Sequence, residues 1–536
     1  MSSKVKCLAA AILLAAAPAA AQDRPPARVA DGRLAGVREG GLNIFRGIPF
    51  ARPPLGALRW RPPVAAVRWP GVRDASAFGP NCMQPLLPPD SLYAVTPTAM
   101  SEDCLTLNVW APSDARNRPV IVWIHGGSLR IGGSAQPMFD GAAFARRGIV
   151  FISVNYRLGV FGWLAHPGLS AESPRHASGN YGLLDQIAAL RWVRANAASF
   201  GGNPRNVTVM GESAGGLSVA WLLASPLARG LFDRAIAQSA NIRAVPALSR
   251  QVYGLPSGEE RGRALAAAVG AADIAALRAV DATTLARTTF PAEGTVEGWA
   301  LPEQVIDAFD GGRQARVPLL AGFNSGEIRS QRIFLPPAPA SAAAYEAEIN
   351  RRYRDLAPAF LRLYPSDDIE NSMLATLRDA IYGWATERMV RGQAAAGLPA
   401  WLYLFDHCDA AARARDMCAF HASELPYVFG LVGPHWPLAA SWPRPDSEAD
   451  RALSDAMLDY WVSFAASGTP RSARGPAWPA YGRTESWMRF AGVPIPGHDM
   501  LPGMFELQDE LVRRRRRAGE QWFVNVGVAA TPVPDR

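Results

Sequence analysis

The chain has 536 residues, of which 49% are hydrophobic and 19% are charged, and this composition excludes a wholly disordered chain. The formal charge of +8 raises the question of nucleic-acid binding, and the most obvious basic cluster is Arg513 to Arg517. No nucleic-acid motif accompanies this run. We therefore interpret it as the solvated face of a late helix and expect no nucleic-acid partner.

The first residues have the pattern of a secretory signal peptide. Lys4 and Lys6 precede an apolar stretch from Leu8 to Ala17, and small residues for cleavage follow, with a predicted cut after Ala21. The apolar stretch is too short to span a membrane. We therefore expect an exported protein, periplasmic or secreted, whose residues 22–536 form a single domain after loss of residues 1–21.

The cysteines fit an oxidising compartment. Cys7 would leave with the signal peptide, and four cysteines would remain: Cys82, Cys104, Cys408 and Cys418. An even number suggests two disulfides, and the sequence allows three pairings. The simplest joins near neighbours in the chain. The spacing does not suit a zinc site, so we expect no metal.

Strands and helices alternate from about residue 120 onward. Taken in chain order, we expect strands at 120–127, 149–159, 206–210, 234–240, 317–326 and 401–407. Residues 181–202 predict an amphipathic helix with Leu183, Ile187, Leu190 and Val193 on its buried face, and residues 217–226 predict another. We expect a loop at 331–341 that leads into a helical insertion. This alternation predicts an α/β fold whose mostly parallel sheet is covered on both faces.

Ser213 lies in Gly211-Glu212-Ser213-Ala214-Gly215, which fits G-x-S-x-G between a predicted strand and a predicted helix. Such a tight turn would hold a nucleophile clear of the sheet. The helix that follows would aim free N–H groups at the reacting centre. The alternative is a helix-capping serine with glycines for packing. Upstream, His125-Gly126-Gly127-Ser128 follows the first predicted strand, and a glycine-rich turn of this kind lets backbone N–H groups approach an oxyanion.

Long blocks of the chain resemble the type-B carboxylesterases, which are related to cholinesterases. These blocks cover most of the chain after the signal peptide and include residues 43–63, 101–110, 154–164, 179–193, 199–216, 421–430 and 458–470. The resemblance implies an α/β-hydrolase fold with helical and loop insertions around an active-site gorge. It also implies hydrolysis of carboxylic esters through an acyl-enzyme intermediate, with no cofactor.

The resemblance assigns a catalytic triad of Ser213, Glu327 and His421, in the chain order of this class of hydrolase. His421 would be the general base and acid, and His407, close to the end of a predicted strand, is the alternative. Glu327 would orient the histidine; the alternative is a surface carboxylate paired with Arg329. His435 and His498 would serve local structure.

The resemblance also assigns supporting groups around the triad. Glu212 and Gly126 would support the site, and Gly127, Ser128 and Ala214 would form the oxyanion hole. Ser128 stands where the family usually has a glycine, so its backbone donor survives only if Ser128 adopts the dihedral angles of the turn.

The resemblance bears on the disulfides as well. The pair Cys82–Cys104 matches the early disulfide of the family. The pair Cys408–Cys418 has no clear family counterpart, although it would fix the loop that carries His421.

The sequence identifies the reaction more closely than the substrate, because lipase, amidase and thioesterase activities use the same catalytic residues. We hypothesise that Arg130 or Arg329 binds a carboxylate on the substrate; the alternative is a salt bridge at the rim. Some members of this fold family are non-catalytic adhesion or binding proteins that lack the nucleophile or its base. Ser213, Glu327 and His421 are all present here, which favours an enzyme.

Overall fold

The computed structural model describes residues 24–94, 99–434 and 436–535, so the predicted signal peptide and His435 lie outside the described residues. The described residues form an eleven-stranded sheet in the order β16-β15-β14-β13-β12-β11-β9-β10-β8-β4-β3. The strands are β3 (Val37–Glu39), β4 (Leu42–Pro49), β8 (Thr106–Pro112), β9 (Arg118–Ile124), β10 (Val150–Val154), β11 (Gly202–Glu212), β12 (Arg234–Gln238), β13 (Leu319–Asn324), β14 (Ala400–Phe405), β15 (Ser486–Phe490) and β16 (Pro494–His498).

The central strands from β10 to β15 run parallel, and antiparallel pairs lie toward both edges of the sheet. This arrangement confirms the predicted mostly parallel sheet of the α/β-hydrolase fold. Two small sheets lie outside it, one made of β1 (Pro26–Val29), β2 (Gly32–Ala35) and β5 (Val72–Asp74), the other of β6 (Asn81–Cys82) and β7 (Met100–Ser101).

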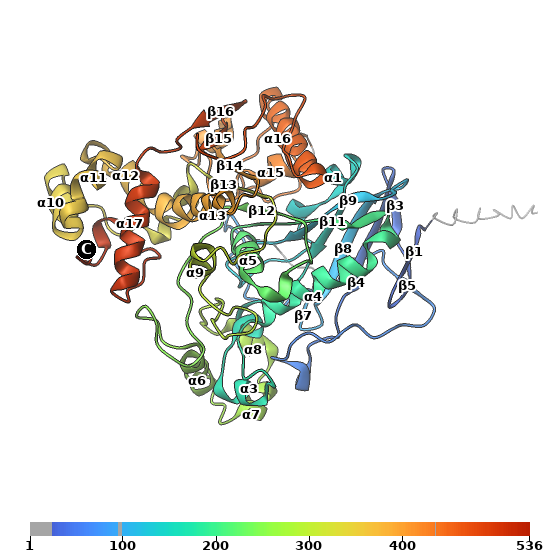
Figure 1. Ribbon diagram of the computed structural model, residues 1–536. Coiled ribbons are helices and arrows are strands. Elements are labelled where there is room, and N and C mark those ends of the chain that lie inside the picture. Colours follow the sequence, from blue (N-terminus) through green and yellow to red (C-terminus); the bar gives the residue numbers. More distant parts are fainter. Residues whose placement is uncertain (1–23, 95–98, 435, 536) are drawn as a thin grey trace, which may run out of the picture.

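Both faces of the sheet are buried, which explains why the central strands read as continuous hydrophobic runs. In β9, Val120, Val122 and Ile124 belong to one core cluster, while Ile121 and Trp123 belong to the cluster on the opposite face. Figure 1 shows the helices of the two layers on either side of the strands. One layer contains α4 (Tyr181–Asn196), α5 (Ala214–Ala224) and α13 (Trp384–Ala395), and the other contains α1 (Ala142–Arg146), α15 (Leu425–Val428) and α16 (Glu448–Ser467).

Helix α4 is more deeply buried than an amphipathic helix would be. The four predicted core positions are at most 1% exposed, but Asp185 and Gln186 are also fully buried. Asp185 is accommodated because Arg157 forms a two-point ion pair with it, at 2.7 and 2.8 Å. The helix packs against α2 (Gly159–Trp163), α5 and β11, so little of its surface faces solvent.

The predicted loop and helical insertion are present. The segment after residue 331 leads into α10 (Ala342–Tyr353), α11 (Ala357–Leu363) and α12 (Ile369–Arg378), which share a separate core cluster with α17 (Met504–Arg517) at one end of the molecule (Figure 1).

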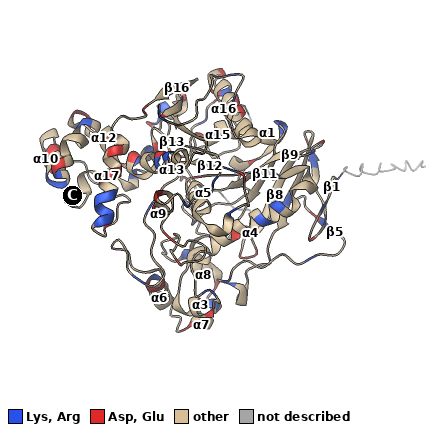
Figure 2. Cartoon of the chain, in the orientation of Figure 1, with Lys and Arg blue, Asp and Glu red and all other residues tan. Residues whose placement is uncertain are grey.

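The arginine run forms the end of α17, seen in blue in Figure 2, but it is not simply a solvated face. Arg514 is 2% exposed and Arg515 is 1% exposed. Arg514 pairs with Asp355 at 2.7 Å, and Arg515 pairs with Glu520 at 2.8 Å. The prediction of a helix was right, and that of a solvated face was wrong for these two residues. Asp355, far away in the sequence, neutralises Arg514, and Glu520, just beyond the helix, neutralises Arg515.

Two disulfides join the four cysteines as near neighbours, Cys82 with Cys104 and Cys408 with Cys418. The second one closes a loop that ends three residues before His421. No helix within the described ranges is long and apolar enough to cross a membrane.

Candidate active site

Ser213 lies on the turn between β11 and α5. Its φ is 57°, in the left-handed region that costs a non-glycine residue free energy. The neighbouring glycines make this turn sterically feasible. A Cβ on Gly211 would lie 2.5 Å from the backbone of Gly215, and a Cβ on Gly215 would lie 2.0 Å from the carbonyl oxygen of Ile124. The fold therefore holds Ser213 in a strained backbone conformation, which presents its hydroxyl at the tip of the turn.

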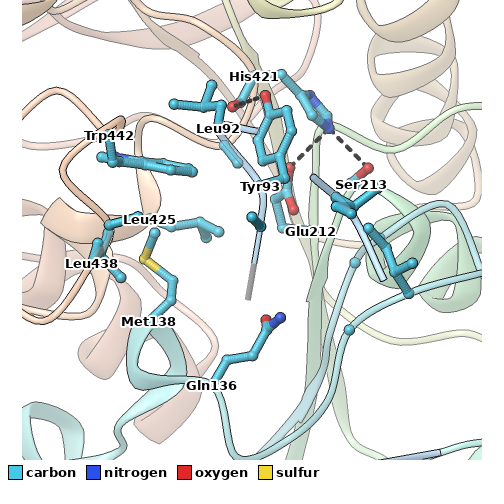
Figure 3. Close-up of a pocket in the computed structure, with 18 of the residues that line it drawn as sticks. Leu92, Tyr93, Gln136, Met138, Glu212, Ser213, His421, Leu425, Leu438 and Trp442 are labelled. Atoms are coloured by element: carbon cyan, nitrogen blue, oxygen red, sulfur yellow. Dashed lines mark hydrogen bonds and ion pairs between the residues drawn. The ribbon is translucent and has the colours of Figure 1, made fainter. Parts of the chain in front are cut away.

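His421 and Glu327 come from loops that follow β14 and β13, at the same edge of the sheet as the end of β11. His421 Nε2 lies 2.8 Å from Ser213 Oγ, the contact drawn as a dashed line in Figure 3. His421 Nδ1 lies 2.5 Å from Glu327 Oε2. The chain thus brings the three predicted triad residues into one hydrogen-bonded series, although 208 positions separate Ser213 from His421.

Glu327 is fully buried, and its second carboxylate oxygen is also satisfied. Oε1 accepts hydrogen bonds from Ser239 Oγ at 2.6 Å and from the backbone N–H of Asn324 at 2.9 Å. The alternative partner, Arg329, instead pairs with Asp416 and donates to Asn371 at 3.0 Å. Glu327 is therefore oriented toward the histidine and away from the surface.

The loop of His421 is tied to the end of β13 by hydrogen bonds to the two residues that precede the histidine. Asn324 Nδ2 donates to the carbonyl of Phe420 at 2.9 Å, and the backbone N–H of Gly326 donates to the carbonyl of Ala419 at 3.0 Å. His407, the alternative base, pairs instead with Asp450 at 2.5 Å. His498 lies on β16, where its Nδ1 is 3.3 Å from Ser486 Oγ.

Glu212 contacts the same histidine from the nucleophile side. Its Oε1 lies 3.2 Å from His421 Nε2 and has no hydrogen-bond donor among the described residues. Burial raises the pKa of Glu212, an effect that the charge of His421 opposes and those of Glu424 and Glu327 reinforce. Burial alone would lower the pKa of His421, but the carboxylates of Glu212 and Glu327 outweigh it and raise that pKa. Glu212 and His421 therefore influence each other's protonation.

The turn after β9 (Arg118–Ile124) contains Gly127 and Ser128, two of the three residues predicted to form the oxyanion hole. Ser128 adopts φ of 55°, so it takes the left-handed conformation in spite of its side chain. A Cβ on Gly127 would lie 2.1 Å from the carbonyl oxygen of Ile131, and a Cβ on Gly126 would lie 3.2 Å from Ser213 Cβ. The backbone N–H groups of Gly127 and Ser128 donate to no acceptor in the described part of the chain. The replacement of glycine by Ser128 therefore leaves the turn intact.

A cavity of about 200 Å³ lies in front of Ser213, and its lining is mainly apolar. Figure 3 shows Trp442, Leu425, Leu438 and Met138 across the cavity from Ser213. The described lining residues include neither Arg nor Lys.

Neither arginine of the carboxylate hypothesis lies in this cavity. Arg130 is exposed and lines a different, smaller pocket with Met83 and Phe290. Arg329 has a carboxylate partner of its own in Asp416. The structure thus places no arginine from the predicted pair against a substrate bound at Ser213.

Sequence reasoning missed several residues that hold the site together. The ring of Tyr382 stacks on the ring of His421 at a centroid distance of 5.1 Å, and the Tyr93 hydroxyl donates to the His421 carbonyl at 2.9 Å. Tyr382 lies in a π-helical turn, Asp379–Gly383, a feature that is often found at functional sites but has no sequence signature. Ser239 offered a signal, since it follows β12 at the carboxyl edge of the parallel sheet.

The described residues contain no group of three or more His, Cys, Asp and Glu side chains placed to hold a metal ion.

Comparisons with known proteins agree on one family. The sequence model of the carboxylesterase family matches residues 23–493. The chain is 37% identical over 498 residues to the fumonisin B1 esterase of Sphingopyxis macrogoltabida, covering 89% of this chain and 88% of that one. It is 35% identical over 471 residues to the para-nitrobenzyl esterase of Bacillus subtilis (strain 168), covering 84% and 91%.

Solved structures give the same result. A PNB esterase structure aligns with a TM-score of 0.74 at 30% identity, covering 90% of this chain and all of that one. A carboxylesterase of Geobacillus stearothermophilus aligns with a TM-score of 0.76 at 32% identity over the same shares.

Proposed function

This chain belongs to the carboxylesterase family and is a carboxylic ester hydrolase, and we propose that it cleaves esters through an acyl-enzyme intermediate on Ser213. The observation that carries this proposal is the series Ser213 Oγ, His421 Nε2, His421 Nδ1 and Glu327 Oε2, joined at 2.8 and 2.5 Å. A serine hydroxyl becomes a useful nucleophile only when such a base removes its proton.

In the first half of the reaction, His421 takes the proton of Ser213 as Oγ attacks the ester carbonyl. The N–H groups of Gly127, Ser128 and Ala214 stabilise the oxyanion of the tetrahedral intermediate. His421 then gives its proton to the departing alkoxide, and the acyl group stays on Ser213. In the second half, His421 deprotonates a water molecule that attacks the acyl-enzyme. The free acid leaves, and the proton returns from His421 to Ser213.

Glu327 keeps His421 in the tautomer whose Nε2 can accept a proton, and it stabilises the imidazolium that forms. Glu212 is a supporting residue, because its Oε1 lies 3.2 Å from the reacting nitrogen of His421. Gly126 supports the site through its lack of a side chain, which lets the oxyanion turn approach Ser213.

The apolar lining supports substrates whose groups next to the scissile bond are uncharged and hydrophobic. The curated relatives named here are esterases by name, which supports esters over amides and thioesters. A cavity of about 200 Å³ favours short acyl groups over the long chains of lipase substrates.

The test uses p-nitrophenyl esters of increasing acyl length with the wild-type protein and Ser213→Ala. We expect the wild type to hydrolyse the short esters best and the variant to lose nearly all of this activity. Retention of activity in Ser213→Ala would refute the proposed nucleophile. A maximum at long acyl chains would refute the preference for short ones.

We further propose that residues 22–536 form one exported domain. The two disulfides support an oxidising compartment such as the periplasm or the outside medium. N-terminal sequencing of the protein recovered from a secreting bacterial host tests this, and we expect the sequence to begin at Gln22. A protein that keeps Met1 and stays in the cytoplasm would refute it.

A further inference from the structure

The cavity in front of Ser213 contains an amide side chain that the proposed mechanism does not use. Gln136 lines this cavity, and Figure 3 shows its amide end pointing into the open space. The backbone of Gln136 makes turn hydrogen bonds with Gly133 and Phe139. Its side chain makes no hydrogen bond with any residue in the ranges 24–94, 99–434 and 436–535. The amide therefore offers a ligand both a donor and an acceptor.

The other polar side chains of the lining already have a partner or a task. The Tyr93 hydroxyl donates to the carbonyl of His421 at 2.9 Å. Gln331 Oε1 accepts a hydrogen bond from the Tyr382 hydroxyl at 2.8 Å. Outside the catalytic machinery, Gln136 is thus the polar residue of the described lining whose side-chain atoms all lack a partner. The machinery itself contributes four polar residues to the lining: Ser128, Glu212, Ser213 and His421.

The segment that carries Gln136 is fixed on both sides. Two residues earlier, Ser134 is buried, and its backbone N–H donates to Asn155 Oδ1 at 2.8 Å. On the other side, the ring of Pro137 restricts the backbone, and Phe139 is 6% exposed. Because this backbone is fixed, the amide is presented to the cavity at a small cost in conformational entropy.

The surroundings of Gln136 favour a polar group without charge. The described lining has neither Arg nor Lys to balance an anion, and the buried carboxylate of Glu212 opposes one. A wholly apolar ester would strip water from the amide of Gln136 and leave it unpaired, which costs free energy. An ester that places a carbonyl or hydroxyl group at this point restores a hydrogen bond.

From this arrangement we infer that Gln136 is a specificity-determining residue, which hydrogen-bonds an uncharged carbonyl or hydroxyl group that the ester substrate carries away from its scissile bond. The inference rests on the proposed function, because it concerns the substrate of the same site. It replaces the hypothesis of a carboxylate-bearing substrate by one of neutral polar esters. A few placed polar groups in a mainly apolar pocket are the usual means of fixing the orientation of a ligand.

The test uses pairs of esters in which a ketone oxygen replaces a methyl group of similar size. Two pairs vary the acyl side: the p-nitrophenyl esters of 4-oxopentanoic and 4-methylpentanoic acid, and those of 5-oxohexanoic and 5-methylhexanoic acid. A third pair varies the alcohol side: 4-oxopentyl acetate and 4-methylpentyl acetate. The oxo-to-methyl ratio of kcat/KM is measured for each pair, with the uncatalysed rate subtracted.

The variant is Gln136→Met, which keeps an unbranched side chain of similar length but removes both hydrogen-bonding groups. The matched control, Gln251→Met, makes the same exchange at an exposed glutamine outside the lining. We expect Gln136→Met to lower the oxo-to-methyl ratio by about two- to tenfold in at least one pair, the effect of one neutral hydrogen bond. Hydrolysis of the methyl esters should be kept or improved, whereas a merely structural role would lower both members of a pair equally. Gln251→Met should leave every ratio unchanged.

Ratios that Gln136→Met leaves unchanged in all three pairs would overturn the inference and leave the esterase assignment intact. Failure of the proposed function looks different, since Ser213→Ala would then still hydrolyse the esters.

A second measurement uses the wild type alone. Burying a ketone in an apolar cavity without a donor costs free energy, so a cavity with no polar partner would favour the methyl ester of each pair. We expect Gln136 to bring the oxo-to-methyl ratio to one or above in at least one pair. A ratio below one in all three pairs would overturn the inference even if Gln136→Met failed to fold.

Discussion

Replacing Glu327 by Gln changes one atom of the proposed triad and should nevertheless almost stop catalysis. The reason lies in the partners of the carboxylate. Oε1 accepts hydrogen bonds from Ser239 Oγ at 2.6 Å and from the Asn324 N–H at 2.9 Å, so the amide oxygen of a glutamine must take this position. The amide NH₂ then faces His421 Nδ1 at the position of Oε2, 2.5 Å away in the wild type.

An NH₂ group at this position can only donate, so His421 Nδ1 has to be the acceptor and the proton moves to Nε2. Nε2 then cannot accept the proton of Ser213. Stabilisation of the imidazolium by a negative charge is lost as well. An amide in the corresponding position of other serine hydrolases lowers kcat by about 10⁴-fold, which corresponds to about 5.5 kcal/mol of transition-state stabilisation.

The assay is steady-state hydrolysis of a short p-nitrophenyl ester by Glu327→Gln, with the thermal midpoint measured to confirm folding. Ser239→Ala is the matched control, because it removes one donor to Glu327 but keeps the carboxylate and the tautomer. We expect a loss of about 10⁴-fold in kcat for Glu327→Gln and a far smaller loss for Ser239→Ala. A folded Glu327→Gln that keeps kcat within tenfold of the wild type would refute the tautomer argument.

Three further predictions follow from the geometry. Ser128→Gly should keep kcat within a few-fold, because the backbone N–H remains and the φ of 55° suits glycine; a hundredfold loss would show that the hydroxyl contributes directly. Glu212→Gln removes a carboxylate that raises the pKa of His421. Because catalysis requires neutral His421, the acidic limb of the pH profile of kcat/KM should move to lower pH. An acidic limb that stays in place or moves to higher pH would contradict this. Replacing Cys408 and Cys418 together by serine opens a loop of 10 residues and should lower the free energy of unfolding by about 2–3 kcal/mol in denaturant titrations, whereas unchanged unfolding would contradict a stabilising role.

The sequence predicted the fold well where local patterns determine structure. The strands at β9, β11 and β13 were recognisable because both faces of the sheet are buried, which makes the runs continuously apolar. The glycines beside Ser213 were informative because only their lack of a side chain permits the turn. Contacts between segments that are distant in the sequence were harder to predict from these local patterns. The ion pair of Arg514 with Asp355 spans 159 positions, so the burial of that arginine could not be inferred from the basic run alone.

The candidate site, too, combines residues that sequence patterns reveal with contacts that depend on the folded chain. Glu327 and His421 were assigned through a resemblance, and the structure brings them together with Ser213. Tyr382 was missed because its stacking on His421 depends on a π-helical turn that no residue pattern marks. Arg130 and Arg329 were chosen because they lie next to catalytic segments in the sequence, and neither of them lines the cavity at Ser213.

The account depends most directly on the reactivity of the Ser213 hydroxyl and its activation by His421. Labelling the purified, oxidised protein with a fluorophosphonate and mapping the modified peptide by mass spectrometry measures both. We predict one label per chain, on Ser213, with the labelling rate greatly reduced in His421→Ala. Absence of label on Ser213 in the folded wild-type protein, or equal labelling rates in the two proteins, would contradict the account.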